Sequence, residues 1–188
     1  NFYLTEEYEK AQKILKNFDK KYEFYYWFRV KKEAQIIIKD KGYDEGINYL
    51  SLKFSKIKNP NVKMVFDIAN FYKNSKNYEK AIEYYTEIIS SLDDNSEIKS
   101  DLLYRRGGSY ERLGNFQKAD EDLKYSLRIN PDDAYVLNYL AYSWLERDYK
   151  IDEAMRMLEK AYALRSNDPY ITDSIGWAYY LIENYTCL

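Results

Sequence analysis

The sequence contains no histidine and only one cysteine, so it lacks most of the side chains that catalysis and metal binding use. Without histidine there is no Ser-His-Asp or Cys-His arrangement. A single cysteine forms neither an internal disulfide nor a thiolate-rich zinc site. A glycine-rich phosphate loop ending in Lys-Ser or Lys-Thr is also absent. We therefore predict that the protein is not an enzyme and holds no cofactor and no metal.

Glycine and proline are scarce as well, with six and three residues among 188. An all-β fold needs many tight turns, so this scarcity favours long helices. The 29 Lys and Arg nearly balance the 31 Asp and Glu, and the net charge of -2 gives no bulk attraction to nucleic acid or anionic lipid. No apolar run approaches the roughly 18 residues of a transmembrane helix. We predict that the partner is not nucleic acid and that the chain has no transmembrane segment, although a local charged patch remains open.

Aromatic residues are abundant, with 23 Tyr, eight Phe and three Trp. The Tyr-rich and Lys-containing strip over residues 20–32 permits two interpretations. Aromatic and basic side chains together can stack single-stranded nucleic acid, but the helical spacing of Tyr22, Tyr25, Tyr26 and Phe28 also suits packing in a core or a partner groove. We favour packing. The abundant Lys, Asn, Ile and Tyr are typical of an AT-rich genome and favour a bacterial source.

Carboxylates also occur in clusters, at residues 120–122 and 132–133. Paired carboxylates can hydrolyse glycosides. These follow small residues or precede predicted helices, so we interpret them as a solvated face and as helix caps.

Two series of small residues recur at a period near 35. In the first series a large apolar residue precedes each small one by three positions, and the intervals are 35, 35, 38 and 35: Ala11, Gly46, Ala81, Ala119 and Ala154. In the second series a large apolar residue follows by three positions, and the intervals are 35, 38, 34 and 35: Ala34, Ala69, Gly107, Ala141 and Gly176. Two helices approach closely only where a side chain is nearly absent. The series therefore predict a repeated helical hairpin.

Apolar residues between these positions follow helical rather than alternating spacing. The pattern predicts about ten helices, near residues 5–19, 24–40, 43–57, 61–74, 78–92, 97–113, 116–129, 134–147, 151–164 and 169–184. The short polar links between them make neighbouring helices antiparallel.

These residues resemble the tetratricopeptide repeat family, whose unit of about 34 residues carries small and large apolar residues at fixed positions. The pattern is matched best by Leu103, Gly107, Tyr110, Phe116, Ala119, Leu123 and Pro131. Leu137, Ala141, Trp144, Ala154, Leu158 and Ala161 match it next best. The resemblance is strong in the last hundred residues, and the stretch from Asn138 to Tyr179 is also similar to the C-terminal repeats of multi-repeat bacterial members. The first sixty resemble the family less, since Gly46 replaces a packing alanine and Lys53, like Ser126 later, occupies a site that is usually small and apolar.

The resemblance implies an all-α, right-handed superhelical solenoid of antiparallel hairpins. We expect a single array over residues 1–188, with a half repeat at 5–19, repeats at 27–60, 62–95, 100–133 and 134–168, and a terminal helix at 169–184. We interpret the chain as a fragment of a longer protein. The sequence is also compatible with a signal peptide or a lipid anchor that was removed in processing.

The resemblance also implies a protein-interaction scaffold that binds a partner peptide or protein on a concave surface made by the first helix of each hairpin. Transferred residue by residue, the expected partner-binding residues are Lys31, Gln35, Lys63, Phe66, Asn70, Tyr104, Arg105, Tyr135, Asn138, Tyr142, Tyr170, Asp173 and Trp177. For each aromatic residue, a purely structural role remains open.

Two further hypotheses come from the same pattern. Some family members clamp the C-terminal carboxylate of heat-shock chaperones, but Gln35, Asp67 and Asp101 stand where Asn, Asn and Lys are expected, which argues against a clamp here. Alternatively, the chain is a structural or oligomerisation module that assembles through its terminal helices. For that module we expect a partly bare face on the last helix, made by Ile171, Ile175, Ala178, Tyr179 and Ile182.

Overall fold

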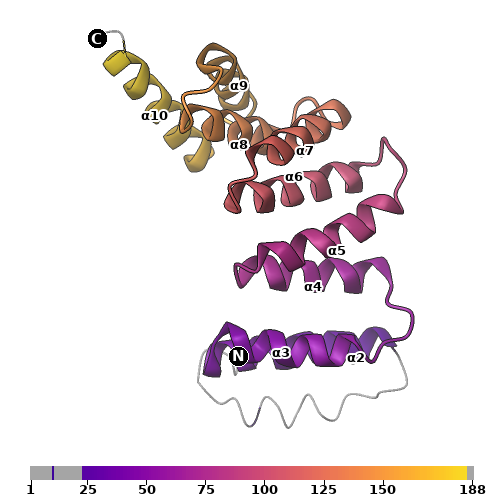
Figure 1. Cartoon of the computed structure of the whole chain (residues 1–188). Coiled ribbons are helices and arrows are strands. Elements are labelled where there is room, and N and C mark those ends of the chain that lie inside the picture. The colour runs from indigo at the N-terminus through magenta and orange to yellow at the C-terminus, as the bar shows by residue number, and fades with distance from the viewer. Residues whose placement is uncertain (1–9, 11–22, 186–188) are drawn as a thin grey trace. The chain divides into compact units, whose positions relative to one another are not determined.

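The computed structural model describes residue 10 and residues 23–185, and every element of secondary structure in that part of the chain is helical. The predicted all-α fold is confirmed (Figure 1). Over the described residues the helices are α2 (Glu23–Lys41), α3 (Tyr43–Phe54), α4 (Val62–Asn74), α5 (Tyr78–Ser90), α6 (Glu97–Arg112), α7 (Phe116–Ile129), α8 (Ala134–Leu145), α9 (Ile151–Leu164) and α10 (Pro169–Tyr185). Of the helix expected at residues 5–19, only Lys10 is described, and it is helical; the rest lies outside the described residues.

The chain divides into two compact units, Asn1–Ser90 and Ser91–Leu188. In the first unit, α2 packs on α3 and α4 packs on α5. In the second unit, α6 packs on α7 and α8 on α9, while α10 lies against α9 and α8 (Figure 1). Within the described residues each unit is thus built from helical hairpins, whose first members are α2 and α4 in the first unit and α6 and α8 in the second, and α10 follows the last hairpin. One uninterrupted array over 1–188 stays a prediction.

Small residues form the contacts inside each hairpin, as their spacing predicts. Ala34, Ala69, Ala81, Ala141 and Ala154 are fully buried, and Ala119 is almost so. A Cβ on Gly46 would run into Ile38 and stand 3.0 Å from the carbonyl oxygen of Ala34. Gly46, which departs from the family pattern, therefore fits a closer helix approach than alanine permits.

Polar side chains fix where the helices begin. Asn61 Oδ1 accepts a hydrogen bond from the Met64 amide at 3.0 Å. The Asp133 side chain accepts from the backbone amides of Tyr135 and Val136, in the first turn of α8. Asp168 does the same for Tyr170 and Ile171, with Pro169 at the first position of α10. The polar links predicted before α8 and α10 are therefore helix starts.

The last described helix corrects one expectation. Ile171 and Ala178 are fully buried and Ile175 is 9% exposed, because they pack into clusters with residues of α8 and α9. The predicted bare face is wrong for these three residues. Tyr179 is 50% exposed, and the uncovered side of α10 is the one that also carries Thr172 and Gly176.

Candidate functional site

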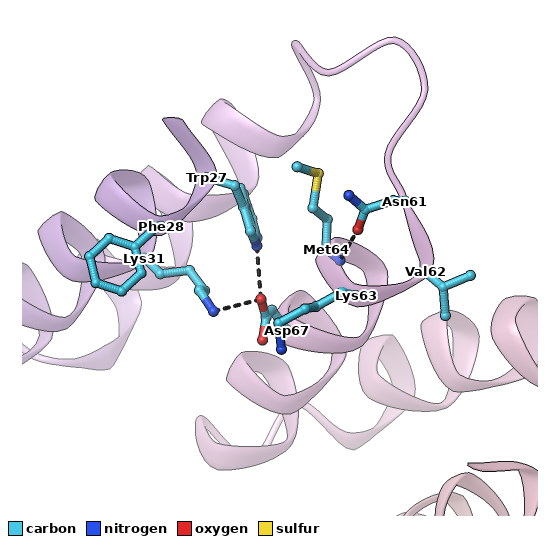
Figure 2. A pocket seen from close by; sticks show the side chains of 8 residues that line it. All are labelled: Trp27, Phe28, Lys31, Asn61, Val62, Lys63, Met64 and Asp67. Atoms are coloured by element: carbon cyan, nitrogen blue, oxygen red, sulfur yellow. Dashed lines mark hydrogen bonds and ion pairs between the residues drawn. The ribbon is translucent and has the colours of Figure 1, made fainter. Parts of the chain in front are cut away.

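The first unit holds a pocket between α2 and α4, the first helices of its two hairpins. Its volume is roughly 670 Å³, which is in the range of sites that take small ligands or peptide side chains. It is lined by Trp27, Phe28 and Lys31 from α2, and by Asn61, Val62, Lys63, Met64 and Asp67 from the start of α4 (Figure 2). Two predicted site residues, Lys31 and Lys63, thus lie in one pocket.

Asp67 organises one wall of this pocket. Its Oδ2 accepts a hydrogen bond from Trp27 Nε1 at 2.9 Å and pairs with Lys31 Nζ at 2.7 Å (Figure 2). Trp27 is 4% exposed, so its ring packs in the core while its N–H donates to Asp67 at the pocket wall. A largely buried carboxylate with a cation and an N–H donor is a stable arrangement. The wall is therefore preorganised.

The remaining lining is mostly apolar. Phe28 and Val62 are 39% and 50% exposed, and Met64 is buried in the core cluster that includes Trp27. Because Asn61 caps α4 directly before Val62, the capping bond also fixes where Val62 and the exposed Lys63 project. The pocket combines an apolar surface with a basic side chain at its rim.

In the second unit, α6 and α8 meet through two tyrosines. The rings of Tyr104 and Tyr139 lie edge to face with centroids 5.7 Å apart, and Tyr139 Oη donates to Glu111 at 3.1 Å. Burial, followed by the charge and hydrogen bond of Glu111, raises the pKa of Tyr139 well above its ordinary range. Burial likewise raises the pKa of Tyr104. Both phenols are therefore neutral at physiological pH, and Tyr139 donates its proton to Glu111.

A second aromatic group joins α8 and α10. Trp177 Nε1 donates to Glu146 at 3.0 Å, and the Trp177 ring stacks on Tyr180 with centroids 5.4 Å apart. Partial burial and the nearby Glu146 raise the pKa of Tyr142. Trp177 and Tyr142 remain 40% and 37% exposed. The two rings offer flat contact area, and Glu146 orients both the indole N–H of Trp177 and the hydroxyl of Tyr142.

Asn138 lies on α8, directly before Tyr139 in the sequence. Its Oδ1 is buried and has no hydrogen-bond partner among the described residues. A buried acceptor without a donor is costly in a folded protein. Because this oxygen is buried, the structure does not present it to a partner.

The other predicted site residues are placed as follows. Gln35 is exposed and Phe66 half-buried, and neither lines the pocket. Asn70 donates to the Phe66 carbonyl and accepts from Tyr85 Oη, so its amide already serves the fold. In the second unit, the Tyr135 hydroxyl donates to Asp168 at 3.0 Å, and Tyr170 and Asp173 are exposed on α10.

Two predicted cations are paired with acids. Lys31 pairs with Asp67 as described, and Arg105 Nε pairs with Asp101 at 2.8 Å. These acids occupy the positions where the sequence already argued against a carboxylate clamp. In each unit the cation is partly neutralised before any partner arrives.

Sequence reasoning did not single out Trp27, Val62 or Met64. One signal could have found Trp27, because it precedes Lys31 by four residues and so shares its helix face. Val62 and Met64 flank the helix start after Asn61, and only the packing of α4 on α2 reveals that they line a pocket.

Metal-binding clusters and membrane spans are both missing from the described part of the chain. There, no group of three or more Cys, Asp or Glu is placed to hold a metal ion. None of the described helices is long and apolar enough to cross a membrane.

Comparison with protein families gives a consistent result. Family models described as tetratricopeptide repeat match residues 100–133 and 62–91. A TPR repeat-containing protein of Pseudomonas aeruginosa is 26% identical over 149 residues, covering 79% of this chain and 25% of that protein. One of Methanocaldococcus jannaschii is 39% identical over 80 residues, covering 42% of this chain and 14% of that protein. The chain thus spans a quarter or less of these relatives.

Solved structures show the same fold. The first TPR of Spaghetti (RPAP3), bound to the HSP90 peptide SRMEEVD, superposes with a TM-score of 0.57 at 20% identity and covers 65% of this chain and 93% of that one. A crystal structure of MamA has a TM-score of 0.60 at 20% identity, covering 78% and 82%.

Proposed function

The chain belongs to the tetratricopeptide repeat family, and from this premise we propose that it is a non-enzymatic scaffold that binds a partner peptide or protein on its first helices. The family is in general a protein-interaction fold without catalysis. That a structural neighbour holds a peptide supports the same use of the fold here.

The pocket between α2 and α4 is the observation that carries this proposal. It lies between first helices, it is mostly apolar, and the bond network of Trp27, Lys31 and Asp67 holds its wall in place. A preformed wall costs little conformational entropy when a ligand binds. We expect it to take a bulky apolar side chain of the partner, with Lys63 at the rim favouring an acidic neighbour.

The aromatic groups of α6, α8 and α10 support binding in the second unit as well. Tyr and Trp give large contact areas with few rotors to immobilise. A chaperone-type carboxylate clamp is disfavoured, because Asp67 and Asp101 already pair with Lys31 and Arg105.

A random peptide library tests the proposal without presupposing the sequence of the partner. Peptides are selected on the purified chain, and their affinities are then measured by calorimetry for the unmodified chain and its variants. Phe28→Ala and Lys63→Glu should each weaken a selected peptide about tenfold or more. Trp177→Ala should weaken peptides that bind the second unit.

Matched variants separate binding from folding. Leu52→Ala removes an apolar side chain of α3 that is 57% exposed, and Lys41→Glu reverses a charge at the other end of α2. Tyr162→Ala on α9 matches Trp177→Ala, with exposures of 38% and 40%. All three controls should leave affinity unchanged. If no library peptide is enriched, or if selected peptides bind the Phe28, Lys63 and Trp177 variants as tightly as the unmodified chain, the proposal is wrong.

A further inference from the structure

Tyr142 of α8 and Trp177 of α10 both donate hydrogen bonds to the carboxylate of Glu146. Trp177 Nε1 lies 3.0 Å from Glu146 Oε1, and the Tyr142 hydroxyl bonds to the same carboxylate. Both donors are uncharged, so they orient the carboxylate without neutralising it. Burial, then Glu146 and then Asp173 raise the pKa of Tyr142, so Asp173 of α10 also acts on this phenol. We call these four residues the α8–α10 face.

The α8–α10 face carries negative charge without a cation of its own. Neither α8 nor α10 contains a lysine or an arginine. Among residues 23–185, no basic side chain pairs with Glu146 or Asp173. Acids on the earlier first helices do have such partners: Glu33 pairs with Arg29, Asp67 with Lys31 and Asp101 with Arg105. The absence of a cation therefore sets the α8–α10 face apart.

The backbone of α8 adds to this negative charge. Glu146 is the C-cap of α8, and the carbonyl end of a helix carries partial negative charge that favours a cation. Arg147 follows directly in the chain, but its guanidinium bonds to Asp120 of α7 and to the Ser143 carbonyl. A carboxylate and the negative end of a helix thus coincide where no basic side chain offsets them.

The two aromatic rings of the face are accessible because of their place in the repeat. Tyr142 and Trp177 stand 35 positions apart, so they hold the same position in successive repeats. Their side chains are 37% and 40% exposed. Since α8 packs against α7, α9 and α10, Tyr142 stays exposed on a helix that has neighbours before and after it. The exposure is thus a property of this repeat position.

We propose that the α8–α10 face binds an arginine side chain of the partner, an assignment that rests on the proposed function. Charge complementarity selects a cation. A guanidinium is planar, so it can stack on the Trp177 or Tyr142 ring while its N–H groups donate to Glu146 and Asp173. The rings favour arginine over lysine, whose ammonium is more strongly hydrated. The second unit thus selects the charge opposite to that favoured by Lys63 in the first.

A peptide of alternating arginine and alanine residues with blocked ends is the probe. Its binding to the isotope-labelled chain is followed through the indole N–H resonances of the three tryptophans. The Trp177 resonance should shift and approach saturation at about 1 mM peptide or below, while those of Trp27 and Trp144 should stay in place. The same peptide with citrulline instead of arginine has nearly the same shape but no charge. It should bind at least about tenfold more weakly.

Glu146→Gln tests whether the charge of the face recognises the peptide. The amide keeps an oxygen for the Trp177 N–H, so the arginine peptide should lose about tenfold in affinity through the missing charge alone. Binding of the citrulline peptide should not change. Adding Asp173→Asn should weaken the arginine peptide further. Glu121→Gln removes an equal charge from an exposed position of α7 and should leave the affinity unchanged. Circular dichroism establishes that each variant is folded.

Several outcomes distinguish this assignment from the proposed function. Library peptides that lose affinity in Trp177→Ala should contain arginine, and their binding without any arginine would overturn the assignment alone. It would also be overturned by a Trp177 resonance that the arginine peptide does not shift, or by equal binding of the arginine and citrulline peptides. An affinity unchanged by Glu146→Gln together with Asp173→Asn would have the same meaning. If neither the arginine peptide nor any library peptide binds, the proposed function is wrong as well.

Discussion

Gly107 of α6 lies so close to Leu123 of α7 that a β-carbon at position 107 would stand 3.0 Å from Leu123 Cγ. The same atom would be 3.3 Å from the Ala119 carbonyl oxygen, which belongs to the backbone and cannot turn away. At Gly176, in the same repeat position, the added atom would meet nothing within 4 Å. Gly107 and Gly176 therefore occupy the same position of the repeat but have different structural surroundings.

This difference predicts opposite effects of one substitution. Gly107→Leu should lower the free energy of unfolding by about 2 kcal/mol or more, because the core of the hairpin is overpacked. Gly176→Leu should raise it by about 0.5 kcal/mol, because the position is open and leucine favours the helix more than glycine does. Urea denaturation at low protein concentration measures both. Equal effects at the two positions would contradict the packing described here.

The second prediction concerns the ion pair between Arg106 and Asp122. Arg106 donates twice, with Nε and Nη2 each 2.7 Å from the carboxylate, and both side chains are largely buried. Asp122→Ala leaves the guanidinium without this partner and should cost about 2 kcal/mol. Asp101→Ala removes the more exposed partner of Arg105 and should cost about 0.5 kcal/mol or less. Denaturant unfolding compares the two, and a larger loss for Asp101→Ala would contradict the assignment.

A third prediction follows from two buried serines. Each of Ser100 and Ser126 donates to the other's carbonyl oxygen, at 3.1 and 2.9 Å, and the hydroxyl oxygens are 2.8 Å apart. Ser126→Ala alone should cost about 1 kcal/mol, because Ser100 loses a partner in a buried site. The double replacement by alanine should cost less than the sum of the two single ones. A double-mutant cycle by thermal unfolding measures this coupling, and strict additivity would argue against the reciprocal bonds.

The fourth prediction is a dependence on alkaline pH. Burial first, and then Glu111, raises the pKa of Tyr139 above its ordinary value of 10.0. The folded chain therefore holds this proton more tightly than the unfolded chain does. The resulting stability is complete below about pH 10 and is lost as the pH rises towards the pKa of the folded state. Tyrosinate absorbance during titration should show Tyr139 ionising late.

Two variants check this prediction. Tyr139→Phe should reduce the loss of stability above about pH 10, and Glu111→Gln should let Tyr139 ionise at lower pH by removing the adjacent charge. If Tyr139→Phe has no effect on that loss of stability, Glu111 does not hold the phenol as the structure places it.

The fold could be predicted from the sequence because each close contact between helices requires a small residue at one particular position. Within the described residues, the alanines and glycines that recur near every 35 positions are buried at helix contacts except at Gly176. Helix starts at Asn61, Asp133 and Asp168 were likewise predictable, since capping is local in the chain. Ser126 at an apolar site was not explicable from the sequence, because its partner Ser100 lies 26 residues away.

The candidate site was predicted less completely. The repeat pattern places Lys31, Lys63, Tyr104 and Trp177 on first helices, and the structure puts the two lysines in one pocket. The pairing of Lys31 with Asp67, like that of Tyr139 with Glu111, joins residues of two neighbouring first helices. The partner-binding roles of all these residues stay predictions.

The sequence by itself therefore determined the helical hairpins and which helix comes first in each, because the spacing of small residues and caps is a property of one chain segment at a time. Only the tertiary structure decided which acids neutralise the lysine and arginine side chains, which aromatic rings remain exposed and which side of α10 is uncovered. These features depend on how side chains from separate helices meet, and the free energy of such contacts is set by distances and burial that the order of residues does not contain.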